Sequence, residues 1–229
     1  MQSLSWWWVI ALICAIVTFI VVLKFMRAGG DQAIKLPEVR THSSTSVEEA
    51  ISQRRSLRLY KNEPLAVADV AQLLWACQGL TDKQRMLRAT PSAGALYPLE
   101  IYLIVGEVRG LSVGIFRYNP LKHELSKVHD GDRRVALSEA AFSQQWIHQA
   151  PASIVLCANY KITEKKYGQR ARQYVHMEIG AAAENVYLQA TALGMGTVLV
   201  GAFDDAAVQK VLEGVPDEVP LCILPIGKK

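Results

Sequence analysis

Three arginines and a serine lie close together at residues 54 to 58, in the order Arg54-Arg55-Ser56-Leu57-Arg58. An arginine side chain carries a rigid fork of donors that fits phosphate oxygens, and it stays charged at any physiological pH. The segment therefore favours binding of an anion. The alternative is that its cations only complement the dipole at the end of a preceding helix, which contributes about 0.3–1 kcal/mol per charge. These five residues alone do not separate the two interpretations.

A second segment combines turn residues with small side chains. Residues 90–98 read Thr-Pro-Ser-Ala-Gly-Ala-Leu-Tyr-Pro and stand directly before an apolar run, which indicates a loop that leads into a buried strand. A third segment, residues 161–172, is polar and basic and contains Lys166-Tyr167-Gly168. A charge run of this kind is by default a solvated loop, although lysine and tyrosine can also move protons in catalysis.

Together, residues 54–58 and 90–98 resemble the FMN-dependent nitroreductase superfamily. Nitroreductases proper usually carry Asn and Gln after the Pro-Ser pair, whereas Ser92-Ala93-Gly94-Ala95-Leu96-Tyr97-Pro98 is similar to the SagB-type branch, the dehydrogenases that oxidise azolines in peptide natural products. The resemblance covers residues 46 to 229. It implies a homodimer with two FMN sites at the interface and two-electron hydride transfer through the flavin.

The resemblance also implies roles for particular residues. In one chain, the FMN phosphate and ribityl group would be held by Arg54, Arg55, Ser56, Arg58 and Lys228. The flavin ring would be covered by Pro91, Ser92, Ala93 and Gly94 of the other chain, and its edge would face Gly194, Met195, Gly196 and Gly201. In the azoline dehydrogenases, a Lys-Tyr pair at the position of Lys166 and Tyr167 serves the proton-removing step.

Gly194-Met195-Gly196 also invites comparison with a dinucleotide-binding fingerprint. That fingerprint requires a strand, a glycine loop and then a helix, so that the pyrophosphate meets a helix N-terminus. Here the glycines join an expected helix to an expected strand. Two interpretations remain for them: a close approach to the flavin ring, as in the resembling proteins, or a plain C-cap of the helix.

The N-terminal part of the chain predicts a membrane anchor. No charged residue occurs from Leu4 to Leu23, which matches the roughly 20 residues that a helix needs to cross a bilayer. Basic residues follow this run at Lys24 and Arg27, so the positive-inside rule predicts a single-pass membrane protein whose catalytic domain is cytoplasmic. The expected organisation is an anchor at 1–27, a linker at 28–45 and an FMN-binding domain at 46–229.

The elements expected after the linker predict an α+β fold, a nitroreductase-like, mainly antiparallel sheet wrapped by helices. Ser46-Val47-Glu48-Glu49 has the form of a capping box, and its helix would point Ile51 inward. Further helices are expected after Pro64, within 131–142, at 173–193 and after Asp204. Strands are expected at 99–105, 113–118, 124–128, 152–159, 197–201 and 221–226.

Charge and composition exclude several classes of function. The net charge of +4 is mild and the basic residues are scattered outside 54–58, so nucleic-acid binding is not indicated. The four cysteines lie in apolar runs and the five histidines show no ligand spacing, so no metal site is predicted. Three functions stay open: an FMN oxidoreductase that uses NAD(P)H, an azoline dehydrogenase acting on thiazoline or oxazoline peptides, and a flavin-binding membrane protein without turnover.

Overall fold

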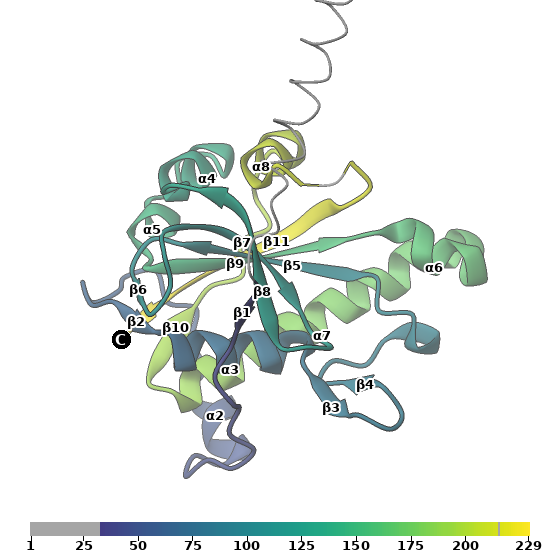
Figure 1. The fold of residues 1–229 in the computed structure, drawn as a ribbon, viewed down its shortest axis with the longest axis horizontal. Coiled ribbons are helices and arrows are strands. Elements are labelled where there is room, and N and C mark those ends of the chain that lie inside the picture. Colours follow the sequence, from purple (N-terminus) through teal and green to yellow (C-terminus); the bar gives the residue numbers. More distant parts are fainter. Residues whose placement is uncertain (1–32, 215) are drawn as a thin grey trace, which may run out of the picture. The chain divides into compact units, whose positions relative to one another are not determined.

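The computed structural model describes residues 33–214 and 216–229, and Ala33–Lys229 forms one compact unit. At its centre is a sheet of seven strands in the order β1-β8-β7-β5-β9-β11-β10, in which every neighbouring pair is antiparallel (Figure 1). These strands are β1 (Ile34–Lys35), β5 (Leu99–Val105), β7 (Gly114–Asn119), β8 (Glu124–Asp130), β9 (Ala152–Ala158), β10 (Met195–Thr197) and β11 (Val219–Lys228). The expected mainly antiparallel sheet is confirmed.

Two short strand pairs stand outside this sheet, β2 (Leu65–Ala66) with β6 (Val108–Arg109) and β3 (Leu80–Asp82) with β4 (Leu87–Arg88). The helices are α2 (Val47–Gln53), α3 (Val67–Gln78), α4 (Arg134–Ala140), α5 (Gln145–Gln149), α6 (Tyr160–Tyr167), α7 (Ala171–Ala192) and α8 (Asp205–Leu212). Single 3₁₀ turns occur at Ala93–Ala95 and Gly168–Arg170.

Helices cover both faces of the sheet. In β5, Ile101 and Leu103 join a core that includes α3 and α7, whereas Tyr102 and Ile104 join a core that includes α4, α5 and α8. This alternation follows from the two-residue period of a strand. Every residue of β9 is buried, and so is every residue of β5 except Glu100, which explains why both strands read as largely apolar runs in the sequence.

Helix α2 begins as the capping box predicts, because the Ser46 hydroxyl accepts a hydrogen bond from Glu49 N at 3.0 Å. The prediction that Ile51 points inward is wrong. Ile51 is 57% exposed, and Ala50, at 5% exposed, faces the core instead. A helix this short carries too few apolar positions for its period to fix which face is buried.

The predicted linker contains a strand. Within 28–45, β1 pairs with β8 through Ile34 and Leu125, and Leu36 is buried at 4% exposure. Ile34 and Leu36 supply enough apolar contact to add this two-residue strand to the edge of the sheet. Residues 161–172 are not a loop either, since α6 occupies most of them, with the Asn159 side chain accepting from Lys161 N at its start.

The membrane prediction needs correction as well. Among residues 33–214 and 216–229, no helix combines the length and the apolar character that crossing a membrane would require. The predicted span from Leu4 to Leu23 lies outside the described residues. The predicted localisation is corrected to that extent: the described part of the chain contains no membrane-spanning helix.

Candidate functional site

The arginine segment 54–58 leaves α2 and runs beside β10. Arg54 caps the C-terminus of α2, Ser56 forms a parallel bridge with Thr197, and Leu57 N donates to Thr197 O at 2.9 Å. The segment thus extends the edge of the sheet at β10. Its position is fixed by backbone hydrogen bonds, which leaves the side chains of Arg54, Arg55 and Arg58 to other partners.

Tyr187 of α7 organises one side of this segment. Its hydroxyl accepts from Leu199 N at 2.7 Å and lies 3.1 Å from Ser56 Oγ. The Arg54 guanidinium stands 5.0 Å from the centre of the Tyr187 ring and 3.8 Å from a carboxylate oxygen of Glu184. A cation over an aromatic face is attracted by the ring, so Tyr187 holds both Ser56 and Arg54 in place.

Arg55 and Arg58 keep their charge available. Arg55 is exposed and donates to the backbone carbonyls of Ser52 and Arg54 at 2.9 and 2.7 Å, and Arg58 stands 5.4 Å from the ring centre of Trp146. Within the described part of the chain, no carboxylate forms an ion pair with either side chain. A guanidinium without a carboxylate partner keeps its donors available for an anion such as a phosphate.

The structure also brings the C-terminal residues to this place. Lys228 pairs with Met195 in the β10–β11 register, and its carbonyl accepts from Lys61 N at 3.1 Å. The Lys228 ammonium lies 3.2 Å from a carboxylate oxygen of Glu63. Gly196 therefore contacts the arginine segment through Leu57, whereas Lys228 lies just beyond the segment, beside Lys61, and already has an acidic partner in Glu63.

Local backbone geometry and packing explain why glycine occupies two of the positions near β10. Gly194 ends α7 with φ of +69°, a left-handed conformation that glycine adopts without strain, so the C-cap interpretation holds there. A Cβ on Gly196 would lie 2.5 Å from a methyl carbon of Leu57. A Cβ on Gly201 would meet nothing within 4 Å, which leaves open space above its backbone.

The loop at 91–97 and the pair Lys166-Tyr167 form a second group. Gly94 has φ of +63°, and a Cβ there would lie 2.8 Å from both Lys166 Nζ and Tyr167 OH. Tyr167 packs edge-to-face on Tyr174 of α7, with ring centres 5.0 Å apart. Lys166 is exposed. Two segments more than seventy residues apart in the sequence thus meet at a glycine whose missing side chain leaves room for them.

The two groups contact different parts of α7. The arginine segment meets Glu184 and Tyr187, whereas the 91–97 loop meets Glu178. At a rise of roughly 1.5 Å per residue, Glu178 and Tyr187 are about 13 Å apart along the helix. Neither residue was among the site residues expected from the sequence. Glu178 offered a signal, because it interrupts the apolar face of α7 between Val175 and Ala182.

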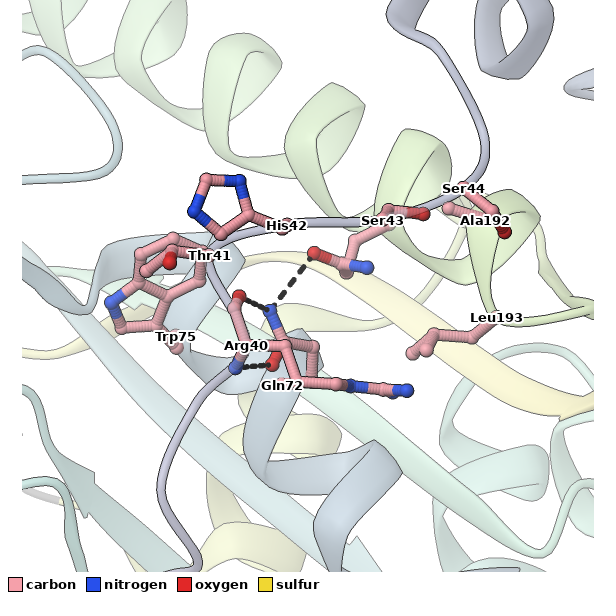
Figure 2. Close-up of a pocket in the computed structure, with 10 residues that line it drawn as sticks. Arg40, Thr41, His42, Ser43, Ser44, Gln72, Trp75, Ala192 and Leu193 are labelled. Atoms are coloured by element: carbon pink, nitrogen blue, oxygen red, sulfur yellow. Dashed lines mark hydrogen bonds between the residues drawn. The ribbon is translucent and has the colours of Figure 1, made fainter.

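A separate cavity of about 320 Å³ lies where residues 40–44 cross α3 and α7 (Figure 2). Gln72 accepts from Arg40 N at 2.8 Å and donates to Arg40 O at 2.9 Å and to Gln189 Oε1 at 3.1 Å. Its lining contains none of the predicted site residues. These hydrogen bonds attach the segment before α2 to the domain, so we assign no site to this cavity.

The sequence profile of the nitroreductase family matches residues 51–228. A protein of Methanocaldococcus jannaschii that is named as a nitroreductase is 40% identical over 88% of this chain and 98% of its own length. A solved structure of a protein from Ralstonia eutropha, also named as a nitroreductase, superposes with a TM-score of 0.76 at 25% identity, covering 86% of this chain and 89% of that one. The chain belongs to the nitroreductase family.

A more distant relative is the microcin B17-processing protein McbC of Escherichia coli, 24% identical over 65% of this chain and 56% of its own length. This distance leaves membership in the SagB-type branch as a prediction. Membership in the wider family makes the chain an FMN-dependent oxidoreductase. The alternative of a flavin-binding protein without turnover is therefore wrong.

Proposed function

We propose that the chain acts as a homodimer and transfers two electrons, as a hydride, between a reduced nicotinamide and a small organic acceptor such as a quinone or a nitro compound. In this proposal the FMN phosphate and ribityl group are held in one protomer by Arg54, Arg55, Ser56, Arg58 and Lys228. The ring is covered by residues 91–94 of the other protomer, and its edge faces the backbone at 194–196 and 201.

The observation that carries this proposal is the pair of guanidiniums on Arg55 and Arg58 without a carboxylate partner among the described residues. Each of these guanidiniums can donate to phosphate oxygens without first breaking an ion pair. FMN supplies the hydride chemistry when it is bound, and the chain contributes binding, orientation and exclusion of water.

Titration of apoprotein with FMN, followed by the quenching of flavin fluorescence, tests the phosphate assignment. Arg58→Ala removes a charge-assisted hydrogen bond of about 1.5–3 kcal/mol, so affinity should fall roughly 10- to 150-fold. Arg133→Ala provides the control, because Arg133 stands at the start of α4 beside His129 and Glu213. Unchanged affinity in both Arg55→Ala and Arg58→Ala would contradict the assignment. Bleaching of the bound flavin by NAD(P)H tests the reaction itself.

A second candidate function is the oxidation of azolines, and it is favoured by the contact of Gly94 with Lys166 and Tyr167. Conversion of a thiazoline or oxazoline to the aromatic azole removes a hydride and a proton from the substrate. In this function Lys166, which is exposed beside the 91–97 loop, would act as the base that accepts the proton. The resemblance of residues 92–98 to the SagB-type branch supports the same role.

Lys166→Ala distinguishes the two functions. Under the azoline hypothesis this variant should keep FMN affinity and lose turnover of a thiazoline-containing peptide, whereas Lys165→Ala, one residue earlier on α6 and also exposed, should retain turnover. If the wild-type protein leaves such peptides unchanged, and both it and Lys166→Ala reduce quinones with NAD(P)H equally well, the azoline function is wrong and the general oxidoreductase remains.

A further inference from the structure

Glu178 is a buried carboxylate that neither candidate function uses. It lies on α7, is 4% exposed, and accepts a hydrogen bond from Gln78 Nε2 at 3.0 Å. Gln78 is the last residue of α3 and is itself fully buried. Removal of a carboxylate from water is costly unless its oxygens are hydrogen-bonded. The second partner of Glu178 is therefore informative.

That partner is Ser92 in the 91–97 loop. Its hydroxyl accepts from Tyr97 N at 2.9 Å and interacts with the Glu178 carboxylate, whose pKa it lowers; the two residues line the same cavity. With one hydroxyl, Ser92 both closes the loop on itself and ties it to α7. Glu178 also borders an open cavity of about 300 Å³ whose other walls include Pro91, Ser92 and Ala93. The buried carboxylate thus lies directly beneath the loop that the proposed function places on the flavin ring.

The next residues of the loop depend on this attachment. Gly94 has no side chain with which to hold its position, and the site of its absent Cβ lies 2.8 Å from Lys166 Nζ and from Tyr167 OH. A small displacement of Ser92 would therefore change the spacing between the loop and α6. Conversely, a fixed Ser92 keeps Lys166 and Tyr167 at a constant distance from the loop backbone.

We propose that Glu178 is a positioning residue, which through Ser92 holds the 91–97 loop against Lys166 and Tyr167 and thereby fixes the surface that the loop offers to the flavin. The part concerning the flavin rests on the proposed function. The coupling between Glu178, Ser92 and the loop is a property of the chain alone and can be measured without cofactor.

The groups that face Glu178 make this attachment sensitive to protonation. Burial raises the pKa of Glu178 to about 7, whereas the bonds from Ser92 and Gln78 and the charge of Arg88 on β4 lower it. Cys77 of α3 also faces the carboxylate, and burial raises the pKa of that thiol. The ionised carboxylate accepts from its donors more strongly, whereas its burial favours the protonated form, so the attachment of the loop changes as Glu178 titrates.

A double-mutant cycle of Ser92→Ala and Glu178→Gln tests the coupling. Both substitutions weaken the same bond, so the double variant should unfold at nearly the temperature of the less stable single variant and bind FMN no more weakly than the weaker single variant. Glu218→Gln is the matched control. Glu218 is equally buried, at 5% exposed, but bonds to Tyr102 and Arg117, so its effect should add to that of Ser92→Ala.

A purely structural role for Glu178 would leave the flavin unaffected. We therefore expect the affinity of wild-type protein for FMN to show an inflection near neutral pH that Glu178→Gln lacks, together with a shifted absorbance band of the bound flavin. Additive effects in the cycle, or a wild-type pH profile in Glu178→Gln, would overturn the proposal. If Glu178→Gln does not fold, the inflection should still be lost in Ser92→Ala. Absence of FMN binding by the wild type would overturn the proposed function, while the unfolding cycle would still decide the coupling.

Discussion

Two buried carboxylates are held in different ways. Glu218 accepts from Tyr102 OH at 2.5 Å and from the Arg117 guanidinium at 2.7 Å, so a cation compensates its charge. Glu178 accepts from Gln78 and interacts with Ser92, both of which are neutral. Burial raises the pKa of both carboxyls: that of Glu218 is raised despite the nearby Arg117 charge, and that of Glu178 is raised to about 7 from its ordinary value of 4.5.

This pKa predicts a pH-dependent stability. Between 4.5 and about 7 the folded protein keeps a proton on Glu178 that the unfolded chain has lost, so the stability contributed by this group falls as the pH rises through that window. Glu178→Gln is neutral throughout and should lack this part of the decline. Urea unfolding of both proteins between about pH 5 and pH 8 measures the difference.

The control is Glu139→Gln, since Glu139 is exposed on α4. Its stability should follow that of the wild type across the same pH range. A constant gap between wild type and Glu178→Gln at every pH would contradict the prediction.

Among the elements, β10 depends on close contact with the arginine segment. Leu57 N bonds to Thr197 O, and the Leu57 side chain occupies the space beside Gly196. On the neighbouring strand, Gly227 makes the same kind of room for Tyr60, whose ring lies 2.5 Å from where a Cβ would stand. Two glycines on adjacent strands thus allow the segment after α2 to pack flat on the edge of the sheet.

Gly196→Ala should separate these elements. The added methyl would lie 2.5 Å from a Leu57 carbon, and overpacking of this kind costs about 1–3 kcal/mol. We expect a lower urea midpoint and, because Arg58 follows Leu57 directly, weaker FMN binding. Gly201→Ala is the matched comparison, since its methyl would enter open space and should leave the urea midpoint unchanged. Equal midpoints for the two variants would contradict this account of the packing.

For the molecule as a whole, several large apolar side chains are exposed on α2, on α7 and beyond the arginine segment. Val47 and Ile51 of α2 are 65% and 57% exposed, Leu59 beyond the arginine segment is 78% exposed, and Met177 of α7 is 65% exposed. Helices α2 and α7 are packed together (Figure 1). Large exposed apolar side chains are candidates for burial at a protein interface, which is consistent with the proposal that a second copy of the chain covers them.

Met177→Lys should weaken that association. A lysine ammonium at a buried interface must lose its water without gaining a partner, so analytical ultracentrifugation should show a shift from dimer towards monomer, with FMN affinity falling in parallel. Leu121→Lys is the control, because Leu121 is 46% exposed in the turn between β7 and β8. Monomeric wild-type protein that binds FMN tightly would contradict the two-chain site.

Patterns within a few neighbouring residues were enough to predict several helices and strands. The apolar runs of β5 and β9, the capping box at Ser46 and the helical period of α3 all predicted their elements, because burial on one face imposes a fixed period on neighbouring residues. The sequence also marked the arginine segment and the 90–98 loop, since phosphate recognition and tight turns each require particular residue types at short spacing.

Tertiary structure alone decided which distant residues meet. Ile51 points to solvent because Ala50 packs in the core, and residues 161–167 form α6 instead of a loop because Tyr160 and Thr163 are buried on its inner side. The contacts of Gly94 with Lys166 and of Glu178 with Ser92 join segments that are tens of residues apart. Hydrophobic period is a property of neighbours along the chain, so it carries no information about partners across the fold. Those partners are set by how the helices pack on the sheet, and their chemistry is visible only once the chain has folded.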